Sequence, residues 1–222
     1  LMISNENEYN KYTKGKTEIK KNNSVYKGET EIKKNNSVYE GETEMNNMRK
    51  FHNWIKQDLL ERHAKNQNNL LDLACGKGGD IHKWINANIN KVLAVDINKN
   101  YLQEAEKRKT KVLKYNNIDI DFIQRDMRKD TVNASELFDV INCQFAIHYF
   151  FESDKTVNNF FNNVSENLKE NGVFIGTVFD GLRVFNSLVD GDLERKVDNE
   201  TVFKLKKGYT TEVFEDIKPY GD

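Results

Sequence analysis

A glycine-rich run, LLDLACGKGGD from Leu70 to Asp80, contains the residues whose spacing best suits ligand binding. Its apolar first half predicts a buried strand, and its second half opens the turn into a helix. Glycine has no Cβ, so the backbone can turn tightly and approach a ligand closely at Gly76, Gly78 and Gly79. Several nucleotide-binding folds share such a turn, so by itself it leaves the ligand open.

Acidic residues recur where successive strands are expected to end. Asp72 lies in the glycine-rich run, Asp96 ends KVLAVD, and Asp126 ends DFIQRD. A carboxylate about 20 residues beyond the turn accepts hydrogen bonds from both hydroxyls of an adenosine ribose. The glycines follow GxGG rather than the GxGxxG of a dinucleotide site, and no diphosphate clamp is evident. The set favours S-adenosylmethionine as the ligand, although Asp126 alone could equally be an acid that caps a strand end.

Apolar runs and helix-like stretches alternate through the rest of the chain. The runs lie at 70–75, 91–96, 121–126, 138–145 and 172–179, and the helical stretches between them at 80–88, 99–110 and 154–169. This alternation implies right-handed crossovers and a mostly parallel sheet with helices on both faces. We therefore expect a Rossmann-like α/β domain whose ligands gather at the carboxyl ends of the strands, where the strand order reverses.

The first part of the chain differs from the rest. Residues 1–47 lack apolar periodicity and contain a tandem repeat, KTEIKKNNSVYKG followed by ETEIKKNNSVYEG. Such a composition is typical of a flexible arm, and its lysine pairs offer only a weak tether for RNA because glutamates lie close by. From Met48 an apolar stripe predicts a helix ahead of the sheet. We expect an arm at 1–47 and one domain at 48–222.

The composition limits the partners and the compartment. With 34 basic and 35 acidic residues the chain has no overall attraction for polyanions, so any basic surface must be local. Cys75 and Cys143 lie in apolar runs without metal-ligand spacing, so we expect reduced cysteines and no metal. No run reaches the length of a membrane span, and no signal peptide begins the chain. These features predict an intracellular protein without a membrane partner.

Three motifs resemble the mRNA cap guanine-N7 methyltransferases of eukaryotes and viruses. They are RKFHNWIK (49–56), LDLACGKGGD (71–80) and CQFAIHYFFES (143–153), of which the last is the most specific. The similarity runs from Arg49 to Lys206, and GTVFDG (176–181) looks more like the large-DNA-virus branch. The resemblance implies a class I methyltransferase fold and methyl transfer from S-adenosylmethionine to N7 of the cap guanine, with S-adenosylhomocysteine as product.

The resemblance also implies the site residues. The expected cofactor contacts are Asp72 and Gly76 from the turn, and, from the resemblance, Lys56, Ala74, Asp96, Asp126, Gln144 and Tyr149. The expected cap contacts are His52, Asn53, Lys77, Arg108, His148 and Tyr149, with Lys77 and Arg108 on the triphosphate bridge. Ala74 stands where the family more often has glycine, and His52 where asparagine is common.

No discrete catalytic residue is expected, because guanine N7 carries a lone pair and no proton at neutral pH. His148 and Tyr149 would orient the guanine. The expected partners are the capped RNA 5′ end (GpppN) and other components of a capping enzyme, in the nucleus or in a viral factory in the cytoplasm. The alternatives are a methyltransferase for another RNA position or a small molecule, and a catalytically silent subunit of a capping complex.

The C-terminal region is expected to leave the sheet incomplete. After GTVFDG the pattern offers a helix near 182–189 and a strand at 201–206, but no Val-Pro-Glu-like motif before Asp222. In the family such a motif supplies an acid that binds the guanine edge. This predicts a chain that binds S-adenosylmethionine and holds the cap poorly.

Overall fold

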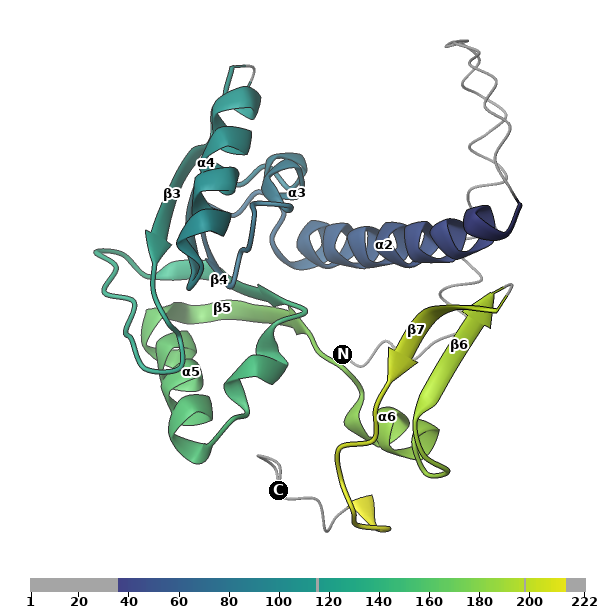
Figure 1. The fold of residues 1–222 in the computed structure, drawn as a ribbon. Helices are drawn as coiled ribbons and strands as arrows, with labels where there is room; N and C mark the ends of the chain where they lie inside the picture. Colours follow the sequence, from purple (N-terminus) through teal and green to yellow (C-terminus); the bar gives the residue numbers. More distant parts are fainter. Residues whose placement is uncertain (1–35, 115, 198, 215–222) are drawn as a thin grey trace. The chain divides into compact units, whose positions relative to one another are not determined.

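The computed structural model describes residues 36–114, 116–197 and 199–214 (Figure 1). The chain divides into two compact units, one holding the residues up to Ile55 with Glu194–Lys204, the other Lys56–Leu193 and the residues from Leu205. The elements are α2 (Asn36–His63), β1 (Asn69–Leu73), α3 (Ile81–Asn86), β2 (Lys91–Asp96), α4 (Lys99–Val112), β3 (Asp119–Gln124), β4 (Phe138–Gln144), the 3₁₀ helix η1 (Ile147–Phe150), α5 (Asp154–Asn167), β5 (Leu168–Thr177), α6 (Gly181–Ser187), β6 (Leu193–Val197) and β7 (Glu200–Leu205).

Strands β1 to β5 form a parallel sheet in the order β3-β2-β1-β4-β5. The chain moves outward from β1 through β2 to β3 and then returns to the other side of β1 with β4. Right-handed crossovers in these two directions place α3 and α4 on one face and α5 on the other (Figure 1). The predicted Rossmann-like fold, with helices on both faces of a parallel sheet, is confirmed.

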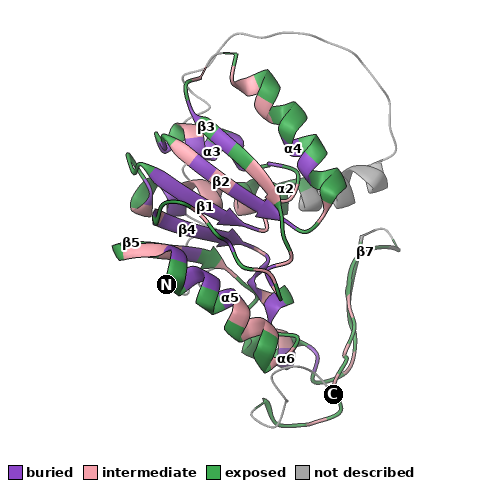
Figure 2. Cartoon of the chain, turned by 90° about the vertical axis from the view of Figure 1, so that its left-hand side faces the viewer, coloured by how far each residue is buried: buried purple, intermediate pink, exposed green. Residues whose placement is uncertain are grey.

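The core lies along the two central strands. β1 is buried at every position and β4 at every position except Asp139, as the colouring of Figure 2 shows. Strands covered on both faces are apolar without alternation, which explains the continuous runs in the sequence. Beside β5, α5 buries Phe160, whose ring stacks on Phe150 with centroids 4.2 Å apart. This packing holds η1 against the sheet, close to the carboxyl ends of the strands.

Helix α2 begins earlier than the apolar stripe predicts. The expected start was Met48, whereas the helix begins at Asn36, because its first turns lack the stripe by which the start was judged. The rest of the predicted arm, residues 1–35, lies outside the described residues. No helix in the described part of the chain, α2 included, has the length and apolar character needed to cross a membrane.

Strand β6 was not predicted, because its sequence, LERKV, is dominated by charged residues. It pairs with β7, the expected strand at 201–206, in a separate two-stranded sheet. The two strands are consecutive in the chain, with β6 ending at Val197 and β7 beginning at Glu200. Within the described residues, the main sheet therefore ends at β5.

Gly78 is the point at which the loop after β1 packs against α3 and α4. Its φ of +67° lies in the left-handed region, and a Cβ there would come within 2.9 Å of Ile81 Cδ1 and 3.0 Å of Ala105 Cβ. The neighbouring Gly79 has no atom within 4 Å of the position of a Cβ. Glycine is thus required for packing at Gly78 and not at Gly79.

We expect Gly78→Ala to lower the free energy of unfolding by about 1–3 kcal/mol, from backbone strain together with the clash. Gly79→Ala, the matched control, should change it by less than about 0.5 kcal/mol. Urea unfolding followed by circular dichroism measures both. Equal stabilities for the two variants would contradict the role of Gly78.

Candidate functional site

The loop that follows β1 contains two further left-handed residues besides Gly78. Ala74 has φ +67° and Gly76 has φ +56°. A residue with a Cβ costs about 1–3 kcal/mol in this region, which gives a physical reason for a family preference for glycine at the position of Ala74. The turn directs the N–H of Gly76 toward the next strand, where it donates to Asp96 Oδ2 at 2.7 Å.

Asp96 joins the loops after β1 and β2. Besides the bond from Gly76, its Oδ1 accepts the N–H of Asn98 at 2.8 Å, and the residue is only 8% exposed. Asn98 in turn caps α4, because its side chain accepts the N–H groups of Asn100 and Tyr101. The predicted ribose acceptor therefore also holds the loops after β1 and β2 in place.

A buried polar chain connects the ends of β1, β4 and β5. Asp72 Oδ1 accepts from Asn142 Nδ2 at 3.0 Å, Asn142 Oδ1 accepts from Gln144 Nε2 at 2.7 Å, and Gln144 Oε1 accepts from Thr177 Oγ1 at 3.0 Å. Asp72 and Gln144 were predicted site residues, whereas Asn142 and Thr177 were not. The signal for Asn142 was an amide inside an otherwise apolar run.

The second carboxylate oxygen of Asp72, Oδ2, is buried without a hydrogen-bond partner among the described residues. Burial, and then the nearby Asp80, raises the pKa of Asp72 well above its ordinary value. Unpartnered buried acceptors are rare, because each loses its hydration without compensation. This oxygen is suited to a positively charged or N–H-bearing ligand group.

Lys56 lies in an ion pair with Asp80. Its Nζ is 3.0 Å and 3.2 Å from the two carboxylate oxygens and 5.7 Å from the centre of the Phe145 ring. Lys83 contacts the same carboxylate at 2.9 Å, so two ammonium groups share this acid. Asp80 was not among the predicted site residues, although it ends the glycine-rich motif.

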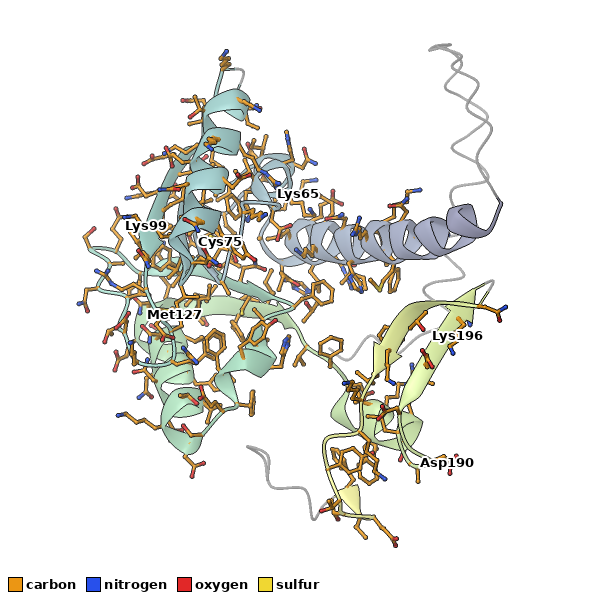
Figure 3. All side chains as sticks on the ribbon, in the orientation of Figure 1. Lys65, Cys75, Lys99, Met127, Asp190 and Lys196 are labelled. Carbon is orange, nitrogen blue, oxygen red and sulfur yellow. The ribbon has the colours of Figure 1, made fainter. Side chains whose placement is uncertain are left out.

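A cavity of about 480 Å³ opens at the carboxyl ends of β1, β2 and β3. It brings together four of the predicted residues: Ala74, Asp96, Asp126 and Tyr149. Its other walls were not predicted and come from the residues that follow the strand ends: Ile97, Arg125, Met127, Arg128, Phe150 and Glu152. Figure 3 labels Met127 in the segment after β3 and Cys75 in the loop after β1. The cavity has the size and largely apolar lining of a small-molecule site.

Asp126 is held by Arg128 on the cavity wall. Arg128 donates from Nε to Oδ1 and from Nη2 to Oδ2, both at 3.0 Å, and its Nη1 donates to Glu152 at 3.0 Å. The hydrogen bonds from Arg128 hold the pKa of Asp126 below its ordinary value. Oδ1 also accepts the backbone N–H of Arg128 at 3.1 Å, so it is Oδ2 that keeps a lone pair with which Asp126 can accept from a ligand.

Two aromatic rings lie beside His148, one from η1 and one after β5. The His148 ring lies 4.2 Å from Tyr149 and 5.2 Å from Phe179, centre to centre. Tyr149 is 66% exposed and Phe179 67% exposed. Burial lowers the pKa of His148, so the imidazole is neutral at pH 7. Phe179 was not predicted; its signal was an aromatic residue directly after the fifth strand.

The expected cap-phosphate residues lie away from the 480 Å³ cavity. Lys77 is exposed, with its Nζ 5.1 Å from the centre of the Tyr101 ring. Arg108 lines a separate cavity of about 340 Å³. His52 and Asn53 belong to the other compact unit, so their role in the site stays a prediction.

The two cysteines are both free thiols, and burial raises the pKa of each. In the part of the chain that the structure describes, no group of histidine, cysteine and acidic side chains is arranged to hold a metal ion.

The fold is that of the Rossmann-like class I methyltransferases. The structure is similar to an S-adenosylmethionine-dependent methyltransferase from Clostridium acetobutylicum, with a TM-score of 0.53 and 21% identity over 86% of this chain and 65% of the other. It is also similar to a Pyrococcus horikoshii protein, with a TM-score of 0.50 and 25% identity over 64% of each chain. These likenesses establish the fold.

The sequence defines the family more narrowly. Residues 11–221 match the mRNA (guanine-N(7))-methyltransferase domain, and the chain belongs to that family. It is 35% identical over 181 residues to the mRNA cap guanine-N(7) methyltransferase of Caenorhabditis elegans, covering 72% of this chain and 48% of the nematode protein. A probable mRNA-capping enzyme of Acanthamoeba polyphaga mimivirus is 30% identical over 203 residues, which cover 79% of this chain and 17% of the viral protein. The chain thus spans about half or less of these relatives, and the resemblance inferred from the motifs is confirmed.

Asp72→Asn should stabilise the free protein at neutral pH. The pKa of Asp72 is higher in the folded state than in the unfolded chain, where an aspartate loses its proton near pH 3.9. Because the folded protein keeps this proton to higher pH, the free energy of unfolding falls as pH rises. Asparagine does not titrate. The melting temperature of the variant should exceed that of the parent near pH 8, and the difference should shrink toward about pH 5.

Asp121→Asn is the matched control, because Asp121 is exposed on β3. Thermal unfolding across this pH range measures all three proteins. A pH-independent difference for Asp72→Asn would contradict the raised pKa.

Proposed function

We propose that this chain binds S-adenosylmethionine and methylates N7 of the guanine in an RNA 5′ cap. The observation that carries the proposal is the convergence of Ala74, Asp96, Asp126 and Tyr149 on one cavity of about 480 Å³, in a chain of the guanine-N7 methyltransferase domain family. The cavity opens at the edge of the sheet where the order of the strands reverses, which is the expected ligand edge of this fold.

The residues at this edge fit the parts of S-adenosylmethionine. Asp96 accepts from the ribose hydroxyls, and Asp126 accepts from the adenine amino group between apolar walls such as Met127. Once Asp72 has lost its proton, its unpartnered Oδ2 suits the methionine ammonium. The Lys56 ammonium, which pairs with Asp80, suits the carboxylate. When bound, S-adenosylmethionine supplies a methyl group on a positively charged sulfur.

The aromatic cluster around His148 receives the guanine. A neutral imidazole can donate to or accept from the guanine edge without adding charge, while Tyr149 and Phe179 offer exposed ring faces. Guanine N7 needs no general base, so these residues orient the ring and exclude water. Holding the reacting atoms in line lowers the barrier by on the order of 7–11 kcal/mol. The methylated ring is cationic and is attracted to the aromatic faces.

The proposed partner is RNA with a capped 5′ end. Further components of a capping enzyme are natural partners, since the similar mimivirus protein is itself described as a probable capping enzyme. The site of action follows that of transcription, either the nucleus or a viral factory in the cytoplasm.

Asp96→Ala should lower affinity for S-adenosylhomocysteine at least about tenfold, because the ribose loses its acceptor. It should also lower the free energy of unfolding by about 1–3 kcal/mol, because the N–H groups of Gly76 and Asn98 lose theirs. Calorimetric titration and urea unfolding measure the two effects.

Asp121→Ala serves as the control for Asp96→Ala, and it should bind like the parent. Unchanged affinity in Asp96→Ala would remove Asp96 from the cofactor site. A parent protein that shows no binding at all would favour a catalytically silent subunit.

His148→Ala and Tyr149→Ala should reduce methylation of the cap dinucleotide GpppG at least about tenfold, with a smaller loss of cofactor affinity. His148→Ala should lower methylation with less effect on cofactor affinity than Tyr149→Ala, because Tyr149 also lines the 480 Å³ cavity. Transfer of a labelled methyl group from S-adenosylmethionine to GpppG provides the measurement.

His63→Ala is the control for the histidine variant, because His63 ends α2 and precedes the amino end of β1. It should retain the parent rate. If both site variants also retain it, the cap-binding role fails. If the parent binds cofactor and leaves GpppG unmethylated, the substrate is a different one.

A further inference from the structure

A second cavity, of about 340 Å³, lies between the loop after β1 and the C-terminal half of α4. It shares no lining residue with the 480 Å³ cavity. Its walls come from the loop, from the first turn of α3 and from α4: Gly78, Gly79, Ile81, His82, Arg108, Lys111 and Val112. We call it the α4 cavity.

The α4 cavity combines an apolar base with a polar rim. Arg108, Lys111 and Val112 are spaced i, i+3 and i+4, so they occupy one face of α4. Ile81 is buried and Val112 half-buried, whereas His82, Arg108 and Lys111 are exposed. Apolar contact at the base and cations at the rim are what the ribose and phosphate of a nucleotide require.

The positive charge at this rim has no acidic partner among the residues that the structure describes. Glu106 pairs with Lys109 at 3.0 Å, whereas neither Arg108 nor Lys111 takes part in an ion pair within the described residues. The chain as a whole carries a net charge of −1, so this is a local concentration of cations. A local basic patch of this kind attracts a polyanion.

The loop wall leaves room for a ligand backbone. At Gly79 no atom lies within 4 Å of the position of a Cβ, so the glycine is not there for packing. Lys83 Nζ donates to the Gly79 carbonyl at 3.3 Å, which holds this backbone in place. Because the backbone at Gly79 is held in place and has open space beside it, a ligand can approach it closely.

We propose that the α4 cavity binds the first nucleotide of the RNA body, directly beyond the cap triphosphate. This rests on the proposed function and on the prediction from the sequence that Lys77 and Arg108 meet the triphosphate. Because Arg108 also lines the α4 cavity, a chain leaving the triphosphate enters it, and Lys111 and His82 contact the next phosphate. The contacts are to backbone groups and carry no sequence preference.

The test compares Lys111→Gln and His82→Gln with the parent, using GpppG and a capped RNA of about six nucleotides as methyl acceptors. Each variant should raise KM for the capped RNA about 5- to 20-fold and leave KM for GpppG within about twofold of the parent value. Lys65→Gln, an exposed lysine just beyond α2, is the matched control and should match the parent on both substrates.

Binding of the same RNA without a cap provides a readout independent of methylation. Fluorescence anisotropy should show weaker binding in Lys111→Gln, and a plot of log affinity against log salt whose slope is lower by about 0.7. Guanosine monophosphate should compete poorly. Strong competition by this free nucleotide would overturn the assignment to an RNA chain.

Parent-like KM and RNA affinity in both variants would overturn the proposal. If the parent leaves GpppG unmethylated, the proposed function fails, while the anisotropy measurement still decides whether the α4 cavity binds RNA. Circular dichroism and titration with S-adenosylhomocysteine confirm that each variant is folded.

Discussion

The ligand edge of this protein depends on the two hydrogen bonds that Asp96 accepts. One comes from Gly76 in the loop after β1 and the other from Asn98, which caps α4. A single carboxylate thereby sets the separation of two loops and the start of a helix. The left-handed Ala74 lines the cavity that results, and Gly78 in the same loop packs against α3 and α4. The hydrogen bonds to Asp96 therefore compensate for the burial of its carboxylate and hold the left-handed backbone at Gly76 in place.

Beneath that edge lies Asp72, a buried acid that lowers the stability of the folded protein. Asp72 has an unpartnered buried oxygen and a raised pKa, although Asn142, Gln144 and Thr177 hold its other oxygen in a continuous polar chain. Fully hydrogen-bonded networks stabilise a core, and an open position in one is costly. A cationic ligand group would complete the network, so stability and ligand binding are linked through one carboxylate.

In the proposed function, the two cavities bind different parts of the substrates according to their chemistry. The 480 Å³ cavity is largely apolar with acids at its edge, which suits an adenosine and a positively charged sulfur. The α4 cavity has cations at its rim, which suits phosphates. Separation keeps phosphate charge away from Asp96 and Asp126, where it would be repelled. Binding of the RNA body can then raise affinity for the substrate without disturbing the methyl donor.

The sequence by itself determined the order of the elements, the parallel sheet and the family, because apolar runs and glycine spacing are local properties of the chain. It also predicted Ala74, Asp96, Asp126 and Tyr149, which meet in one cavity because parallel strands end at one edge. Only the tertiary structure decided the partners of these groups: Gly76 on Asp96, Asp80 on Lys56, and Arg108 in a cavity apart from the others. Such pairings depend on side chains brought together through space, and no spacing along the chain encodes them.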